Sequence, residues 1–200
     1  VTSNSYWASR NPMTTYYEGK STLPYTVFSG TRPTDAGVSG KAAEIMTIGW
    51  GEGNTYVPSG SIVKHRTAGM LFMGDYSYDG SEHPSYGRPF TSRPASLSFD
   101  YKFAPVSGES FMAYVVIENR NGGKVTELAR GELVSGEAVS NYRTATVTLN
   151  YTNLSLKATH AYIVFISSTA QKPSTSPVKH NGEEVHRGNL LTVDNIKFNY

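Results

Sequence analysis

The stretch SLSFDYKF, residues 96–103, alternates apolar and polar side chains without a break. Its large apolar residues are Leu97, Phe99, Tyr101 and Phe103, each separated from the next by a polar one. Successive side chains of a β-strand point to opposite faces of the sheet, so this pattern places one face on a core and the other in water. The segment is therefore predicted to be a half-buried strand.

Other segments carry related patterns. TATVTLNY (144–151) repeats the alternation, whereas FMAYVVIE (111–118) and AYIVFIS (161–167) are continuous apolar runs, typical of central strands covered on both faces. KAAEIMTIGW (41–50) and AGMLFMG (68–74) are weaker candidates. Turn-forming residues separate the segments, and no stretch shows the sustained apolar stripe of a helix. The sequence predicts an all-β, antiparallel sandwich with few or no helices.

The last predicted strand, NLLTVDNIKFNY (189–200), changes its apolar phase part-way along. Alternate apolar residues run in one phase up to Val193 and in the opposite phase from Ile196 onward. A period-two pattern slips in this way only through an extra residue, which is a β-bulge. We expect the bulge at Asp194 and Asn195.

The composition of the chain excludes some classes of function and gives no sign of others. The chain has 200 residues, a length at which a single sandwich domain is common, and contains no cysteine, so thiol chemistry and disulfides are excluded. The formal net charge is only +2, and no basic run suggests nucleic acid as a partner. No apolar run approaches the roughly 20 residues of a transmembrane helix.

Several blocks together resemble one family. In chain order they are SGKAAEIMT (39–47), RPFTSRPASLSFDYKFAP (88–105), ARGEL (129–133), SNYRTATVTLNY (140–151), VFISSTA (164–170) and GNLLTVDNIKFNY (188–200). Their order and spacing resemble the PCMD family, the Putative carbohydrate metabolism domain of Bacteroides-type bacteria, over residues 35–200. The resemblance implies a galactose-binding-like jelly roll similar to carbohydrate-binding modules. The length of the chain and the lack of a visible domain boundary predict one domain over residues 1–200, with residues 1–34 as an amino-terminal segment packed on the family-like core.

The same resemblance implies a setting. Proteins of this kind are secreted or attached to the surface, so we expect an extracellular, outer-surface or periplasmic location in a bacterium. The expected partner is a glycan or oligosaccharide, and other outer-membrane proteins of glycan uptake are further candidate partners.

The carboxyl-terminal VDNI also resembles the close of several carbohydrate-binding modules, in which a last-strand aspartate helps to bind structural calcium. The resemblance makes Asp194 a candidate calcium ligand. Calcium takes six to eight oxygen ligands, and further carboxylates would have to come from the amino-terminal part, where Glu18, Asp35 and Glu44 are the options. The alternative is that Asp194 accepts backbone hydrogen bonds at the bulge without a metal.

Aromatic residues gather in segments rich in glycine, asparagine and aspartate, notably MGDYSYDGSEHPSYGRPF (73–90), which is predicted to be a long loop. Exposed rings could stack on the apolar face of a sugar, and neighbouring polar groups could bind its hydroxyls. The alternative is that the rings brace the loop or cap the sandwich. The candidate sugar-binding residues are Trp50, Tyr56, Tyr76, Tyr78, Tyr86 and Asp75, with Tyr76 and Tyr78 favoured.

These observations favour a non-catalytic glycan-binding module that aids polysaccharide capture. One alternative is a glycoside hydrolase or another carbohydrate-active enzyme, although no spacing in the sequence joins two carboxylates into a catalytic pair. A second alternative is a structural or adhesive surface module that binds protein. No catalytic motif is present, so we expect a binding function rather than an enzyme.

Overall fold

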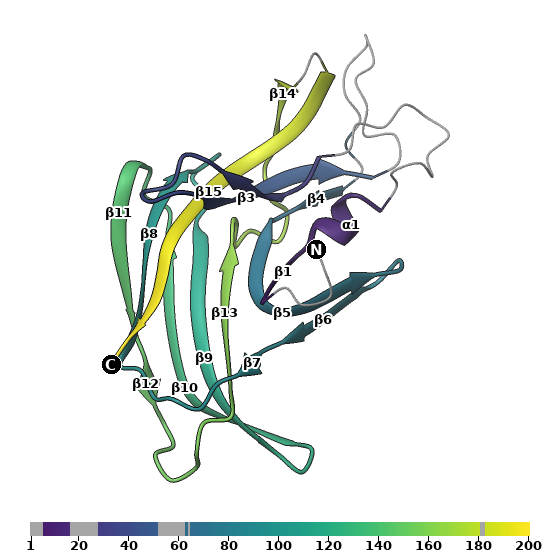
Figure 1. Ribbon diagram of the computed structural model, residues 1–200. Helices are drawn as coiled ribbons and strands as arrows, with labels where there is room; N and C mark the ends of the chain where they lie inside the picture. The colour runs from purple at the N-terminus through teal and green to yellow at the C-terminus, as the bar shows by residue number, and fades with distance from the viewer. Residues whose placement is uncertain (1–5, 17–27, 52–62, 64, 181–182) are drawn as a thin grey trace.

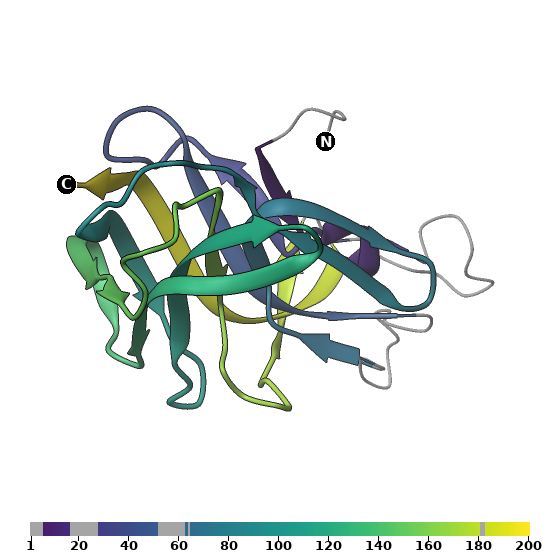
Figure 2. The same ribbon diagram turned by 90° about the horizontal axis from the view of Figure 1, so that it is seen from below.

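The computed structural model describes residues 6–16, 28–51, 63, 65–180 and 183–200 as two antiparallel sheets packed face to face (Figures 1 and 2). The order of the eight-stranded sheet is β1 (Trp7–Ser9), β5 (Met70–Tyr78), β13 (His160–Ile166), β9 (Phe111–Asn121), β10 (Lys124–Ser135) and β12 (Asn150–Tyr151). Two short strands join it from the side: β6 (Glu82–Tyr86) pairs with β5, and β7 (Arg88–Pro89) pairs with β13.

The order of the seven-stranded sheet is β11 (Val139–Thr148), β8 (Ser96–Ala104), β15 (Glu183–Asn199), β3 (Ala42–Trp50) and β2 (Thr31–Thr34). In addition, β14 (Ser176–His180) pairs with β15, and β4 (His65–Thr67) pairs with β3. The one helix among the described residues is α1 (Asn11–Thr14). The predicted all-β, antiparallel jelly-roll sandwich is therefore confirmed. The amino-terminal segment contributes β1 to one sheet and β2 to the other.

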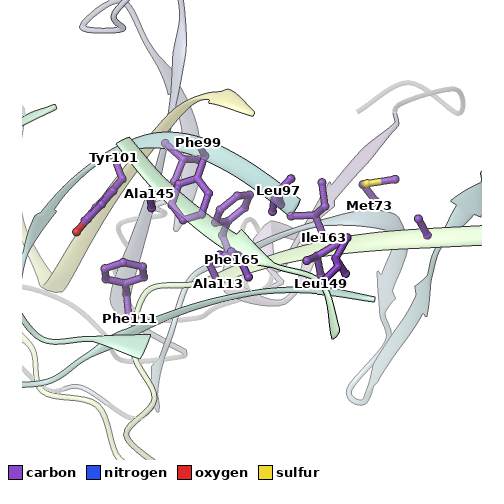
Figure 3. Close-up of a cluster of buried hydrophobic side chains, with 14 of the residues drawn as sticks. Met73, Leu97, Phe99, Tyr101, Phe111, Ala113, Ala145, Leu149, Ile163 and Phe165 are labelled. Atoms are coloured by element: carbon purple, nitrogen blue, oxygen red, sulfur yellow. The ribbon is translucent and has the colours of Figure 1, made fainter. Parts of the chain in front are cut away.

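The core lies between the sheets and follows from the alternation in β8. Leu97, Phe99, Tyr101 and Phe103 are all buried, as the pattern predicted. The Phe99 ring meets the Phe165 ring of β13 edge to face, with 5.0 Å between their centres (Figure 3). Aromatic pairs favour this geometry because the positive edge of one ring faces the negative face of the other.

The segment at 144–151, predicted as one strand, is in fact divided. Strand β11 ends at Thr148 in the seven-stranded sheet, and Asn150 and Tyr151 form β12, which pairs with β10 in the other sheet. Leu149 lies at the crossing, where it is buried and donates its backbone N–H to the Ala95 carbonyl. The alternation continues through the crossing, so the sequence pattern alone does not reveal it.

The prediction of a long loop at 73–90 was wrong. Strand β5 continues to Tyr78, and β6 pairs back on it in the register Gly74 to Tyr86 and Tyr78 to Glu82 (Figure 1). The hairpin residues are rich in turn-forming types because most of their side chains face solvent at the margin of the sandwich. A polar hairpin of this kind has the composition of a loop but the hydrogen bonds of a sheet.

The predicted β-bulge is confirmed. The pairing of β15 with β8 shifts register between Asp194 and Lys197, and Asn195 has a φ of 49°. The Asp194 carboxylate is largely buried and accepts the backbone N–H groups of Val38 at 2.7 Å, Ser39 at 3.3 Å and Asn195 at 2.7 Å. Asp194 therefore hydrogen-bonds backbone groups at the bulge, as one of the two interpretations predicted.

We predict that Asp194→Ala lowers the free energy of unfolding by about 2–3 kcal/mol, because three backbone donors lose a charged acceptor. Urea denaturation monitored by circular dichroism measures the change. Asp35→Ala is the matched control, since Asp35 is an exposed carboxylate whose partner is the exposed Lys41. Equal losses in the two variants would contradict a bracing role for Asp194.

Candidate functional site

Two of the sequence-predicted rings pack within the protein. Trp50 is only 5% exposed, its Nε1–H donates to the Thr67 hydroxyl at 2.8 Å, and its ring lies 4.6 Å from that of His65. Tyr78 meets Trp50 edge-on at 6.0 Å. Trp50 therefore has little free surface for a ligand. Tyr56, another candidate, lies outside the described residues.

Asp75 and Tyr76 are engaged by neighbouring side chains. The exposed Asp75 accepts two hydrogen bonds from Arg88, at 2.7 and 2.8 Å, and these lower the pKa of its carboxyl group. The half-buried Tyr76 donates its hydroxyl to Glu82 at 3.0 Å, and burial is the main reason that its pKa is raised. The structure does not test whether these residues or Tyr78 bind sugar, so that role stays a prediction.

Tyr86, by contrast, belongs to a row of tyrosines that short-range sequence patterns did not reveal. Its ring centre lies 5.4 Å from that of Tyr162 on β13, and Tyr162 lies 6.2 Å from Tyr114 on β9. All three are half-buried on the face of the eight-stranded sheet that points away from the core. We call this surface the tyrosine face and define it by Tyr86, Tyr114 and Tyr162.

The alternation of β9 and β13 explains why these rings face outward. In β9, Ala113 and Val115 point into the core, which leaves Tyr114 on the other side. In β13, Ala161 and Ile163 point inward and leave Tyr162 outside. Both strands are central in the sheet, as predicted, and their outward side is partly covered, since Val116 and Val164 are fully buried and Tyr114 and Tyr162 are half-buried. The missed signal is a tyrosine placed between core residues in an otherwise aliphatic run.

Two glycines hold Tyr86 in place. Gly74 stands opposite Tyr86 with a φ of 150°, and a Cβ there would collide with the Ser85 carbonyl and the Phe72 ring. Gly87 has a φ of 104°, and its Cβ would come within 2.6 Å of the Arg120 guanidinium. That guanidinium donates to the Tyr86 carbonyl at 2.6 Å. Glycine at both positions lets the backbone approach closely enough to lay Tyr86 over the sheet.

The three tyrosine hydroxyls are neutral, and two of them make no hydrogen bond in the described part of the chain. Burial raises the pKa of Tyr114 to about 12, and it also raises those of Tyr86 and Tyr162, so all three phenols keep their protons at physiological pH. Within the described part of the chain, no partner accepts or donates a hydrogen bond at the Tyr114 and Tyr162 hydroxyls. These two groups can therefore bond to a polar ligand while their rings contact its apolar parts.

Charged side chains surround the rings as ion pairs. Arg130 also lies over the Tyr114 ring, 5.4 Å from its centre. The pairs are Arg10–Glu82 at 2.9 Å, Arg120–Glu118 at 2.8 Å and Arg130–Glu127 at 2.9 Å. Nearby on the same sheet face, a pocket of about 400 Å³ is lined in part by Arg10, Met112 and Ile166. The surface thus combines flat rings, polar groups of fixed orientation and a hollow.

The expected calcium ligands do not form one donor set. Both oxygens of Asp194 accept backbone N–H groups, Glu44 pairs with Arg32 at 2.7 Å, and Asp35 pairs with Lys41 at 2.8 Å. Across the residues that the structure describes, no group of three or more His, Asp or Glu side chains could hold a metal ion. This arrangement does not fit the oxygen-rich shell of calcium, and Glu18 lies outside the described residues.

Comparison with known proteins identifies the family of the chain. A family model described as "Putative carbohydrate metabolism domain" (PCMD) matches residues 1–179. The chain belongs to this family. The match confirms the family that the sequence resembles; it takes in the first 34 residues and ends before the block at 188–200. The PCMD description makes this a carbohydrate-related domain, but it does not say whether the domain binds or cleaves.

Solved structures share the fold at low identity. A putative glycoside hydrolase from Bacteroides thetaiotaomicron has 16% identity and a TM-score of 0.65, over 97% of this chain and 62% of its own. Another, from Bacteroides vulgatus, has 15% identity and a TM-score of 0.68, over 96% and 85%. A carbohydrate-binding module specific for non-crystalline cellulose matches with 13% identity and a TM-score of 0.45, over 87% and 82%.

The PCMD chain thus spans 62% of the length of the first of these structures. No curated protein matches it. No helix in the described part of the chain has the length and apolar character needed to cross a membrane.

We predict that Gly87→Ala destabilises the protein more than Gly80→Ala does. Both glycines have positive φ, 104° and 118°, so each substitution costs about 1–2 kcal/mol in backbone strain. Only at Gly87 would the new Cβ also displace Arg120, whereas nothing lies within 4 Å of the Cβ at Gly80. Chemical denaturation should show a loss about 1 kcal/mol larger for Gly87→Ala than for Gly80→Ala, because the hydrogen bond from Arg120 to the Tyr86 carbonyl is disturbed. Equal losses would contradict the packing role.

Proposed function

We propose that this PCMD chain is a non-catalytic glycan-binding module and that the tyrosine face is its binding site. The observation that carries the proposal is the set of half-buried phenols side by side on one sheet face, two of them with hydroxyls unbonded in the described structure. Such hydroxyls would be costly to bury further unless a ligand supplied polar partners.

A sugar ring suits these groups chemically. Its C–H bonds can lie on the negative face of an aromatic ring, and its hydroxyls can both donate and accept hydrogen bonds. Tyrosine supplies a ring for the first contact and a hydroxyl for the second. The ion-paired arginines and glutamates around the rings are held in fixed orientations, which reduces the entropy lost on binding.

The biological setting is part of the proposal. A module of this kind would hold a polysaccharide at the outside of a bacterial cell, where degrading enzymes or uptake proteins of the outer membrane could act on it. The PCMD family description supports the carbohydrate part of this setting.

A hydrolase is a second candidate because the register joins two carboxylates that the sequence did not. Glu118 on β9 stands directly opposite Glu127 on β10, next to Tyr162. Directly opposite residues of antiparallel strands have neighbouring side chains on the same sheet face. Glycosidases use a pair of carboxyl groups that flank the scissile bond, so two neighbouring glutamates are a candidate pair. Each glutamate is also held by an arginine, Glu118 by Arg120 at 2.8 Å and Glu127 by Arg130 at 2.9 Å, so a substrate would have to compete with these ion pairs for the carboxylates.

We predict that Tyr162→Ala weakens glycan binding by about 10- to 30-fold, because the middle ring of the face is lost. Isothermal titration against a panel of plant and microbial oligosaccharides measures the change, and Tyr162→Phe separates the hydroxyl from the ring. Tyr142→Ala is the control, since Tyr142 lies on β11 in the other sheet. Unchanged affinity in Tyr162→Ala, with its melting temperature preserved, would place the site elsewhere.

Reducing-sugar release from the same panel distinguishes the two candidate functions. A binding module should bind the oligosaccharides without releasing reducing sugar, both in the wild type and in Glu127→Gln. Release that is abolished in Glu127→Gln, while binding persists, would instead establish the glutamate pair as a hydrolytic site. Glu137→Gln, a glutamate paired with Arg143 away from the face, is the matched control.

A further inference from the structure

We infer that the tyrosine face selects uncharged glycans and that Glu132 is the carboxylate that disfavours acidic ones. The inference rests on the proposed function, because it concerns the ligand class of the same face. It follows from how the charges of the face are distributed among pairs.

The arginines near the rings are already neutralised. Arg10, Arg120 and Arg130 each donate to a glutamate at 2.8–2.9 Å. Arg120 also donates a second hydrogen bond, to the Tyr86 carbonyl at 2.6 Å. A uronic acid or sulfated sugar would need an available guanidinium, and to obtain one it would have to displace an existing carboxylate. None of these three arginines offers a free charge to a ligand.

Glu132 is different from the other carboxylates of the face. It stands directly opposite Tyr114 in the pairing of β10 with β9, so its side chain lies on the tyrosine face beside that ring. It is exposed and makes no ion pair or side-chain hydrogen bond within the described residues. The nearest arginine in the sequence, Arg130, is occupied by Glu127 through three contacts of 2.9–3.2 Å.

An unpaired carboxylate beside an aromatic ring acts differently on the two ligand classes. With a neutral sugar, it can accept hydrogen bonds from hydroxyls while the Tyr114 ring contacts the C–H face. With an acidic sugar, it brings like charges together, and the neutral phenols offer no compensating charge. The face therefore has an uncompensated negative charge where a sugar would lie, and acidic glycans should bind more weakly by about tenfold.

The test compares neutral and acidic oligosaccharides of equal length by isothermal titration at low and high salt. Probes are β-glucan and mannan oligosaccharides on one side and oligogalacturonates on the other. The wild type should prefer a neutral probe, with affinity that changes less than about twofold with salt. Glu132→Lys should weaken that preference and raise oligogalacturonate affinity by about tenfold, an effect that high salt should reduce.

Matched variants separate a local effect from net charge. Glu132→Gln and Thr146→Lys change the net charge equally, but Thr146 is an exposed residue of β11 in the other sheet. Only the change at Glu132 should alter the ratio of neutral to acidic affinity, with melting temperatures showing that both variants fold. Equal ratios in the two variants, or a wild type that prefers oligogalacturonate, would overturn the inference and leave the proposed glycan-binding function intact. Absence of binding to every probe would remove both.

Discussion

The structure depends on the aromatic packing between the two sheets, centred on the contact of Phe99 with Phe165 (Figure 3). This contact requires β8 and β13 to turn one set of alternate residues inward. Because the period of a strand is two, the other set must face outward. In β8 that set is polar, whereas in β13 it includes Tyr162, which is half-buried and packs with Tyr86 and Tyr114 against a smaller apolar cluster outside the main core. The tyrosine face is thus the reverse side of the packing that holds the sandwich together.

Backbone geometry then decides which rings share that face. Tyr86 reaches it because the β5–β6 hairpin comes close to the sheet at Gly74 and Gly87, where any Cβ would collide. The same approach brings the Tyr86 carbonyl to Arg120, which in turn binds Glu118. The position of the β5–β6 hairpin therefore determines both where the Tyr86 ring lies and how Arg120 is oriented toward Glu118. A similar dependence holds at the bulge, where the Asp194 carboxylate ties Val38 and Ser39 to the last strand.

The paired charges of the tyrosine face favour the proposed binding through shape and hydroxyl groups over binding through net charge. The arginines are paired with glutamates and burial keeps the phenols neutral, which leaves Glu132 as the unpaired charge beside the rings in the described structure. Glu118 and Glu127 are opposite each other in the register, as a catalytic carboxylate pair could be, yet each forms an ion pair with an arginine. The family relationship is consistent with either chemistry, since folds host many functions.

The sequence by itself determined the sandwich class, the inward face of β8, the bulge at Asp194 and the family, because these depend on local periodicity and on motif order. It could not determine that most of residues 73–90 belong to the β5–β6 hairpin and to β7, since turn-rich composition does not distinguish loops from exposed strands. It also could not place Tyr86, Tyr114 and Tyr162 together or set Glu118 opposite Glu127. Those neighbours come from separate strands, so they depend on register and strand order. Strand order is settled by the packing of the whole chain, and only the tertiary structure decides it.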